Sequence, residues 1–142
     1  QKVNKRNLIT VKINSQDRLL VGSKPMHVNG LRKEVKRFIK NPYGDETLPE
    51  WKDTTITYGN KNYDFKVSKG VISLQNDRGT SYAKYIEVQN ELVGAFNDLR
   101  EEEAKAKFNK SFSELDEEQQ DIIKEVIPQM ISEAEPKDIT KK

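Results

Sequence analysis

The sequence predicts an α+β fold with a small, mostly antiparallel sheet and helices on one of its faces. Short segments that alternate apolar and polar residues, as strands do, are interleaved with segments whose apolar residues recur at helical spacing. The expected order is strand, strand, helix, strand, helix, a third helix and a last strand, with a hairpin inserted after the first helix. The chain has 142 residues, which is the length of a single domain.

The first two strands are expected near the start of the chain. Residues 8–13 alternate between apolar and polar side chains, and a polar turn at 14–17 leads to a second apolar run at 19–21. Two antiparallel strands are the predicted product. Pro25 cannot donate to a strand ladder, so we expect the second strand to be broken or bulged there before it resumes at 26–28.

The first helix is expected over residues 30–40. Asn29 is a suitable N-cap, and Pro42 ends the helix because proline disfavours the helical conformation of the residue before it. Apolar residues at i, i+4, i+7 and i+8 gather on one face, which holds Leu31, Val35, Phe38 and Ile39. The opposite side forms a basic face, defined by Lys33, Lys36, Arg37 and Lys40.

An insertion is expected between the first helix and the third strand, at residues 41–70. Within it, residues 54–58 and 63–67 alternate around a polar turn at 59–62, which predicts a small hairpin. The short apolar run at 71–74 then suits a buried central strand.

The longest predicted helix covers residues 82–105. Thr80 or Ser81 can cap its start, and apolar residues recur at helical spacing through its first part. Residues 100–107 favour helix but show no apolar face, so we expect this end of the helix to be exposed.

A third helix is predicted at residues 116–126, where Asp116 and Gln119 have the spacing of a capping box. Pro128 stops the helix from continuing. The segment 129–132 is expected to return to the sheet as a last strand at its edge.

The residues do not indicate an enzyme, a metal centre or a cofactor. The chain has no Cys, and its one histidine, His27, has no serine-centred elbow to work with, so we interpret it as a structural or surface histidine. No spacing of His and acidic residues matches a metal site. The turn at 76–79 lacks the glycine pattern of a nucleotide-binding loop, so an ordinary turn is favoured.

Nucleic-acid binding is also disfavoured, because no aromatic stacking platform accompanies the basic face. No apolar run approaches the ~20 residues needed to cross a bilayer. A sheet edge is the remaining candidate for recognition. It can accept a strand from a partner or a second copy, or it can be blunted by charged flanks and Pro128, and the residues alone leave both interpretations open.

Three stretches of the sequence resemble the periplasmic domain of the ExbD/TolR family. They are residues 8–21, the helix opening at 29–31, and residues 71–82 with the sequence VISLQNDRGTSY. The last stretch, followed by IEVQNEL at 86–92 and by MISEAEP at 130–136, is especially similar to ExbD-type proteins of Bacteroidetes.

The resemblance implies a non-enzymatic periplasmic domain of a single-pass inner-membrane protein. In that family a short cytoplasmic start and one transmembrane helix, which carries the proton-carrying Asp, come before the domain. Residues 1–7 are then expected to be the linker from such an upstream helix. Residues 1–142 form one domain on this interpretation, with insertions at 41–70 and 100–126 and a flexible tail at 133–142.

The resemblance further implies a homodimer that works with an ExbB-like channel and a TonB-like protein, bound in part by strand addition. Two sets of residues are predicted to pair with a partner strand or a second copy: Leu8, Ile9, Thr10 and Val11, and Met130, Ile131 and Ser132. Asp77 and Tyr82 match the family's strand-to-helix acid and the aromatic residue that opens the second helix. We expect the acid to secure the turn and the ring to pack on the sheet.

The predicted function is therefore that of a proton-motive-force energy transducer that supports TonB-dependent uptake across the outer membrane. The alternative is a TolR-like role in stabilising the cell envelope, in which the basic face contacts peptidoglycan. No cofactor and no nucleic acid belong to either interpretation.

Overall fold

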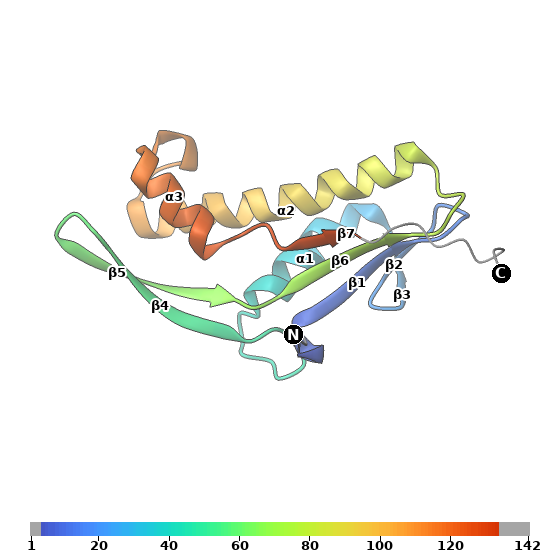
Figure 1. Ribbon diagram of the computed structural model, residues 1–142, viewed down its shortest axis with the longest axis horizontal. Coiled ribbons are helices and arrows are strands. Elements are labelled where there is room, and N and C mark those ends of the chain that lie inside the picture. Colours follow the sequence, from blue (N-terminus) through green and yellow to red (C-terminus); the bar gives the residue numbers. More distant parts are fainter. Residues whose placement is uncertain (1–3, 134–142) are drawn as a thin grey trace.

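The computed structural model describes residues 4–133 and confirms the α+β class (Figure 1). The main sheet has five strands in the order β3-β2-β1-β6-β7. The strands are β1 Leu8–Ile13, β2 Leu19–Val21, β3 Lys24–Met26, β6 Val71–Asn76 and β7 Ile131–Glu133. The β1–β2 and β2–β3 pairs are antiparallel, whereas the β1–β6 and β6–β7 pairs are parallel. The sheet is mixed because helical crossovers precede β6 and β7, and such crossovers allow parallel pairing.

The predicted hairpin is confirmed and is longer than predicted. β4 Trp51–Tyr58 and β5 Lys61–Ser68 form a separate two-stranded antiparallel sheet. The turn places Gly59 at a φ of 63°, in the left-handed region that glycine adopts without strain. In Figure 1 the hairpin projects beyond the main sheet and lies under the C-terminal half of the long helix.

Three helices complete the fold: α1 Leu31–Lys40, α2 Tyr82–Phe108 and α3 Glu117–Val126. α1 and α2 lie on the same face of the main sheet, and α3 lies at the hairpin end of α2 (Figure 1). Short 3-10 turns occur at Lys5–Asn7, Val28–Gly30 and Phe112–Glu114. Within residues 4–133, none of these helices is both long enough and apolar enough to span a bilayer.

The helix starts agree with the sequence except at α1. Ser81 accepts a hydrogen bond from the Lys84 amide and caps α2, and the predicted capping box of Asp116 opens α3. The prediction that Asn29 caps α1 is wrong, because Asn29 lies in the preceding 3-10 turn and Gly30 occupies the N-cap. The amide of Asn29 donates instead to Nδ1 of His27 at 3.1 Å, which gives the single histidine a structural role.

The main core lies between the five-stranded sheet and the two helices above it. β1 contributes Val11 and Ile13, which are both fully buried, and β6 contributes Ile72 and Leu74. The helices contribute Leu31, Val35, Phe38, Ile39, Val88, Leu92, Ala95, Phe96 and Leu99. The apolar residues that alternate along the first strand therefore face the helices, as the sequence predicted.

A second core lies under the end of α2, and it overturns the prediction that this end is exposed. Ala104 is fully buried and Phe108 is 9% exposed. They pack with Phe65 of the hairpin and with Leu115, Ile122, Ile123 and Val126 of the α3 region. The helix ends at Phe108, and Asn109 follows it with a φ of 57° as a left-handed cap, where a glycine is more usual.

Candidate functional site

The last strand, β7, is one of the two edges of the main sheet, and β3 is the other. β7 pairs with β6 on one side only in the sheet order that residues 4–133 define. The amide of Ile72 donates to the carbonyl oxygen of Met130 at 2.9 Å. This bond shows that the backbone carbonyl of Met130 points toward β6. In a parallel ladder the neighbouring residues then point the other way, so the backbone groups of Ile131 and Glu133 face away from β6. An added strand can use these outward groups.

The other predicted pairing segment is not an edge. β1 lies between β2 and β6, and Val11 pairs with Val21 on one side and with Leu74 on the other. The expectation that residues 8–11 offer a free sheet margin is therefore wrong at this strand, because the parallel crossover places β6 beside it. Leu8 itself is 43% exposed, on the sheet face that alternation turns away from the helices.

A side-chain clamp holds the end of β7 against α2. Glu133 accepts hydrogen bonds from the hydroxyl of Tyr85 and from Nε2 of Gln89, the latter at 3.1 Å. Burial, and then the bond to Glu133, raise the pKa of Tyr85 to about 12. The Ile131 side chain packs against the main core. The edge strand is thus anchored by its side chains. Of its outward groups, the Ile131 amide donates locally to the carbonyl oxygen of Gln129 at 3.0 Å, so an added strand has to replace that bond.

Tyr82 does not act as the resemblance implied. Tyr82 is 79% exposed, so its ring does not pack on the sheet, and Tyr85 packs against the core one turn later. Asp77 forms an ion pair with Lys12 at 3.4 Å. The carboxylate that holds the turn to the helix start is that of Asp17, which accepts the Ser81 amide at 2.8 Å and whose pKa is lowered by that bond.

The role of Asp17 was not predicted, because it depends on contact between two turns whose bonded residues are 64 positions apart in the sequence. Its position in a polar turn after the first strand was the only local signal. The φ of 61° at Asp17 fits a residue type that tolerates the left-handed region.

The basic face of α1 is largely neutralised. Nζ of Lys36 contacts the carboxylates of Glu102 and Asp98, and Lys40 lies 3.6 Å from Glu102. Arg37 is paired with Glu34 on its own helix. Of the four residues that define this face, Lys33 is the one without an ion pair in the region that the structure describes.

Arg32 adds a further contact between α1 and α2. It pairs with Glu91 at 3.2 Å and with Asp98 at 3.6 Å. The absence of a side chain at Gly94 leaves room for this, since a Cβ there would lie 2.4 Å from Nη2 of Arg32. The sequence did not predict that Glu91 and Asp98 pair with α1, because the way in which two helices pack is not visible in a local sequence pattern.

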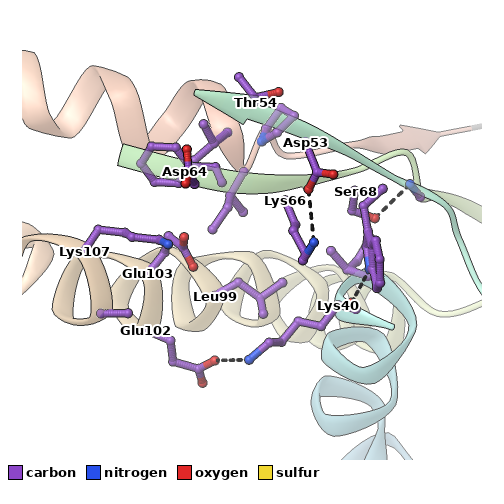
Figure 2. A pocket seen from close by; sticks show the side chains of 18 of the residues that line it. Lys40, Asp53, Thr54, Asp64, Lys66, Ser68, Leu99, Glu102, Glu103 and Lys107 are labelled. Atoms are coloured by element: carbon purple, nitrogen blue, oxygen red, sulfur yellow. Dashed lines mark hydrogen bonds and ion pairs between the residues drawn. The ribbon is translucent and has the colours of Figure 1, made fainter. Parts of the chain in front are cut away.

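A cleft of about 770 Å³ opens next to β7, between the hairpin, α2 and the ends of α1 and α3 (Figure 2). Its apolar lining comprises Ile39, Trp51, Phe65, Phe96, Leu99, Val126, Ile127, Pro128 and Met130. Charged side chains also line it, among them Lys40, Lys66, Glu103 and Lys107. A concave, mainly apolar surface with a few polar groups is typical of binding sites.

Most of the charges at this cleft already have partners. Lys66 contacts Asp53 at 3.0 Å and lies over the ring of Trp51, 4.7 Å from its centroid. Lys107 lies over the ring of Phe65. Glu103 differs, because burial raises its pKa and nearby Lys107 and Lys40 only partly oppose that effect.

The arrangement supports recognition of an extended segment. Across residues 4–133 there is no cluster of three or more His, Cys, Asp or Glu side chains that could hold a metal ion. Of the two edge strands of the main sheet, β3 and β7, it is β7 that lies beside the apolar cleft. These two features bind backbone and side chains of an extended segment.

Comparison with known proteins assigns the family. The sequence model described as biopolymer transport protein ExbD/TolR matches residues 1–99, which is well over half of the chain and includes β1 to β6 and the first part of α2. No curated protein matches the chain significantly. Members of this family are non-enzymatic accessory proteins of biopolymer transport that work with ExbB- or TolQ-like and TonB- or TolA-like partners. The chain belongs to the ExbD/TolR family of biopolymer transport proteins.

Proposed function

We propose that this chain is the periplasmic domain of an inner-membrane energy transducer of the ExbB–ExbD–TonB type. It supports TonB-dependent uptake across the outer membrane by forming a homodimer and by capturing an extended segment of a TonB-like protein. The supporting observation is the free edge of β7, where backbone groups of Ile131 and Glu133 face outward beside an anchored strand. Strand addition uses such groups for affinity.

Dimer formation is the second part of this proposal. The sheet face that carries no helix presents alternate residues of β1, namely Leu8, Thr10 and Lys12, and the Leu8 side chain is 43% exposed. A half-buried face of this kind can be covered by a second copy. Of residues 8–11, the proposal therefore retains Leu8 and Thr10 for contact between copies, through side chains rather than through a backbone edge.

The TolR-like alternative, in which the basic face contacts peptidoglycan, has less support. Lys36, Arg37 and Lys40 are engaged with carboxylates of the same chain. Contact with acidic wall peptides would have to displace those carboxylates. Only Lys33 offers a charge without such a partner among the described residues of this face.

The test replaces Ile131 by proline in the full-length protein in its native cells. Proline removes an outward amide, which now bonds locally to the carbonyl oxygen of Gln129 at 3.0 Å, and leaves the groups that pair with β6. Crosslinking to the TonB-like protein and the uptake rate are measured. We expect both to fall by about tenfold, since one lost hydrogen bond that leaves its partner unsatisfied costs on the order of 1–3 kcal/mol.

The matched control is Ile131→Ala, which removes the same side chain from the core but keeps the amide. It should lower stability and leave crosslinking close to that of the wild type. Equal crosslinking by the proline variant and the wild type would refute strand addition at β7.

A further inference from the structure

We propose that the cleft between the hairpin and α2 binds an extended partner segment in which apolar side chains flank one Lys or Arg, and that Glu103 receives this cation. The proposal rests on the proposed function, because the segment is the continuation of the strand that adds to β7. It assigns the cleft a specificity that the strand edge alone cannot provide, since backbone bonds do not distinguish side chains.

The position of Glu103 on α2 is unusual for an acid. Leu92, Phe96 and Leu99 form the stripe that faces the main core, and Glu103 follows Leu99 at i+4 on the same stripe. The main sheet has ended at this level, and the cleft takes its place. The Glu103 side chain is therefore half-buried, and its carboxylate loses part of its contact with water.

Glu103 also lacks a direct partner. Within residues 4–133 it forms neither a hydrogen bond nor an ion pair, whereas its neighbour Glu102 pairs with Lys36 and Lys40. Lys107 is engaged with the ring of Phe65. The charge that Glu103 offers to a ligand in the cleft is therefore negative, and a half-buried carboxylate gains from a cation that brings its own hydrogen bonds.

The cleft runs directly into the β7 edge. Pro128 and Met130, the residues just before β7, line it, and Met130 is 42% exposed. A strand that pairs with the outer side of β7 and extends past Ile131 is thereby directed into the cleft. The volume of about 770 Å³ exceeds one side chain and accommodates a few residues of an extended segment (Figure 2).

The single tryptophan provides a local reporter of occupancy. Trp51 lines the cleft, donates from Nε1 to the carbonyl oxygen of Lys40 at 2.9 Å, and lies under Lys66. Its emission changes when an occupant displaces Lys66 or excludes water from the ring. Binding at β7 alone leaves this environment unaltered.

The experiment titrates the 142-residue chain with short peptides of alternating valine and threonine, with blocked ends, that carry one lysine at each position in turn. A matching set carries methionine in place of the lysine. Binding is followed by Trp51 emission and by calorimetry. We expect at least one lysine peptide to bind about tenfold more tightly than its methionine counterpart, as hydrogen bonds to charged groups imply.

Two variants separate the role of Glu103 from general charge. Glu103→Gln should remove the preference for lysine while keeping the binding of the methionine peptides. Glu87→Gln removes one charge from the same helix at a residue that pairs with Lys84 outside the cleft, and it should keep the preference. Ile131→Pro should weaken both peptide sets equally.

The outcomes also distinguish this proposal from the proposed function. If peptides bind and lose affinity with Ile131→Pro but show no lysine preference, strand addition stands and the cleft proposal is refuted. A lysine preference that survives Glu103→Gln, or binding that leaves Trp51 emission unchanged, refutes it as well. If no peptide binds, the cleft proposal fails, and the cellular crosslinking test decides strand addition independently.

Discussion

The two cores of the molecule are built on different principles. The main core, formed by the five-stranded sheet with α1 and α2, is mostly aliphatic, with Phe38 and Phe96 as its two buried rings. The second core, formed by the hairpin, the end of α2 and α3, is centred on rings. Phe108 lies 4.9 Å from the ring of Tyr63 and 5.7 Å from that of Tyr58.

This difference shows how a small sheet is made stable. A two-stranded hairpin is marginal in water by itself, so β4 and β5 depend on the helices that cover them. Large aromatic side chains supply much buried area from few positions, which suits a surface of only two strands. The main sheet has five strands and achieves the same result with smaller side chains.

α2 serves both cores because its buried face changes direction along its length. Leu99 is the last residue that faces the main core, and Ala104 is the first that faces the second core. Over five residues, the direction in which a side chain points around the helix axis advances by about 140° beyond one full turn. The two regions are therefore coupled through one rigid helix and not through a shared sheet.

The largest expected effect comes from Phe65→Ala, which empties the middle of the second core. Phe65 is 2% exposed, and truncation of a buried Phe costs on the order of 3–5 kcal/mol. We expect this loss to open the hairpin and α3 locally while the main sheet persists. Amide hydrogen exchange should show faster exchange in β4, β5 and α3, with little change in β1 and β6.

Leu92→Ala is the matched substitution in the main core, where it should accelerate exchange in every element. If Phe65→Ala instead lowers the protection of β1 and β6 as much as that of the hairpin, the two cores unfold as a single cooperative unit. The two cores would then differ in the residues that form them but not in how they unfold.

A smaller effect is expected from Gly70→Ala at the junction of the two regions, between β5 and β6. A Cβ there would lie 3.0 Å from Ile39 Cδ1 and from Pro49 Cγ. Overpacking of this kind costs about 1–3 kcal/mol. Urea unfolding of the main region should shift to a lower urea concentration, because Ile39 and Phe38, which the added Cβ would crowd, belong to the main core.

The control for this substitution is Gly30→Ala, where no atom lies within 4 Å of the added Cβ and φ is negative. It should be neutral or stabilising by up to about 1 kcal/mol, since it lowers the entropy of the unfolded chain. A loss of stability at residue 30 equal to that at residue 70 would remove packing as the explanation.

The sequence predicted the local elements well because each carries its own signal. The capping box at Asp116 and the alternation on both sides of Gly59 are readable within a few residues. The second core was not predicted, because residues 100–107 have only two small apolar residues, Ala104 and Ala106, and the partners of Ala104 come from the hairpin and α3. The mixed sheet also depends on long crossovers, which no local pattern reports.

The candidate site was predicted in part for the same reason. Residues 129–132 were expected at a sheet edge, and β7 occupies that edge. The cleft was not predicted, because four separate elements converge to form it and its key acid, Glu103, lies in a run of three glutamates that resembles an ordinary solvated surface. Only the position of Glu103 relative to Leu99 on the helix could have indicated it.

The smallest expected effect contrasts two tyrosines that each donate to a carboxylate, one in each region. Tyr85 bonds to Glu133 in the main region, and Tyr58 bonds to Asp116 in the second. Burial is the largest cause of the raised pKa of Tyr85, whereas for Tyr58 the hydrogen bond is the largest. Tyr85→Phe should cost below about 1 kcal/mol at neutral pH, because the bond is largely open to solvent.

The alkaline range separates the two residues more clearly. The pKa of a tyrosine in the unfolded chain is near 10, whereas the pKa of Tyr85 in the folded chain is about 12. As pH rises, the unfolded state therefore releases the proton first. Stability is therefore fully present below pH 10 and falls as pH rises toward 12. Urea unfolding across this range should show the decline in the wild type and in Tyr58→Phe, and a flatter profile in Tyr85→Phe. Identical profiles for the wild type and Tyr85→Phe would mean that the clamp on β7 does not hold the edge strand in solution.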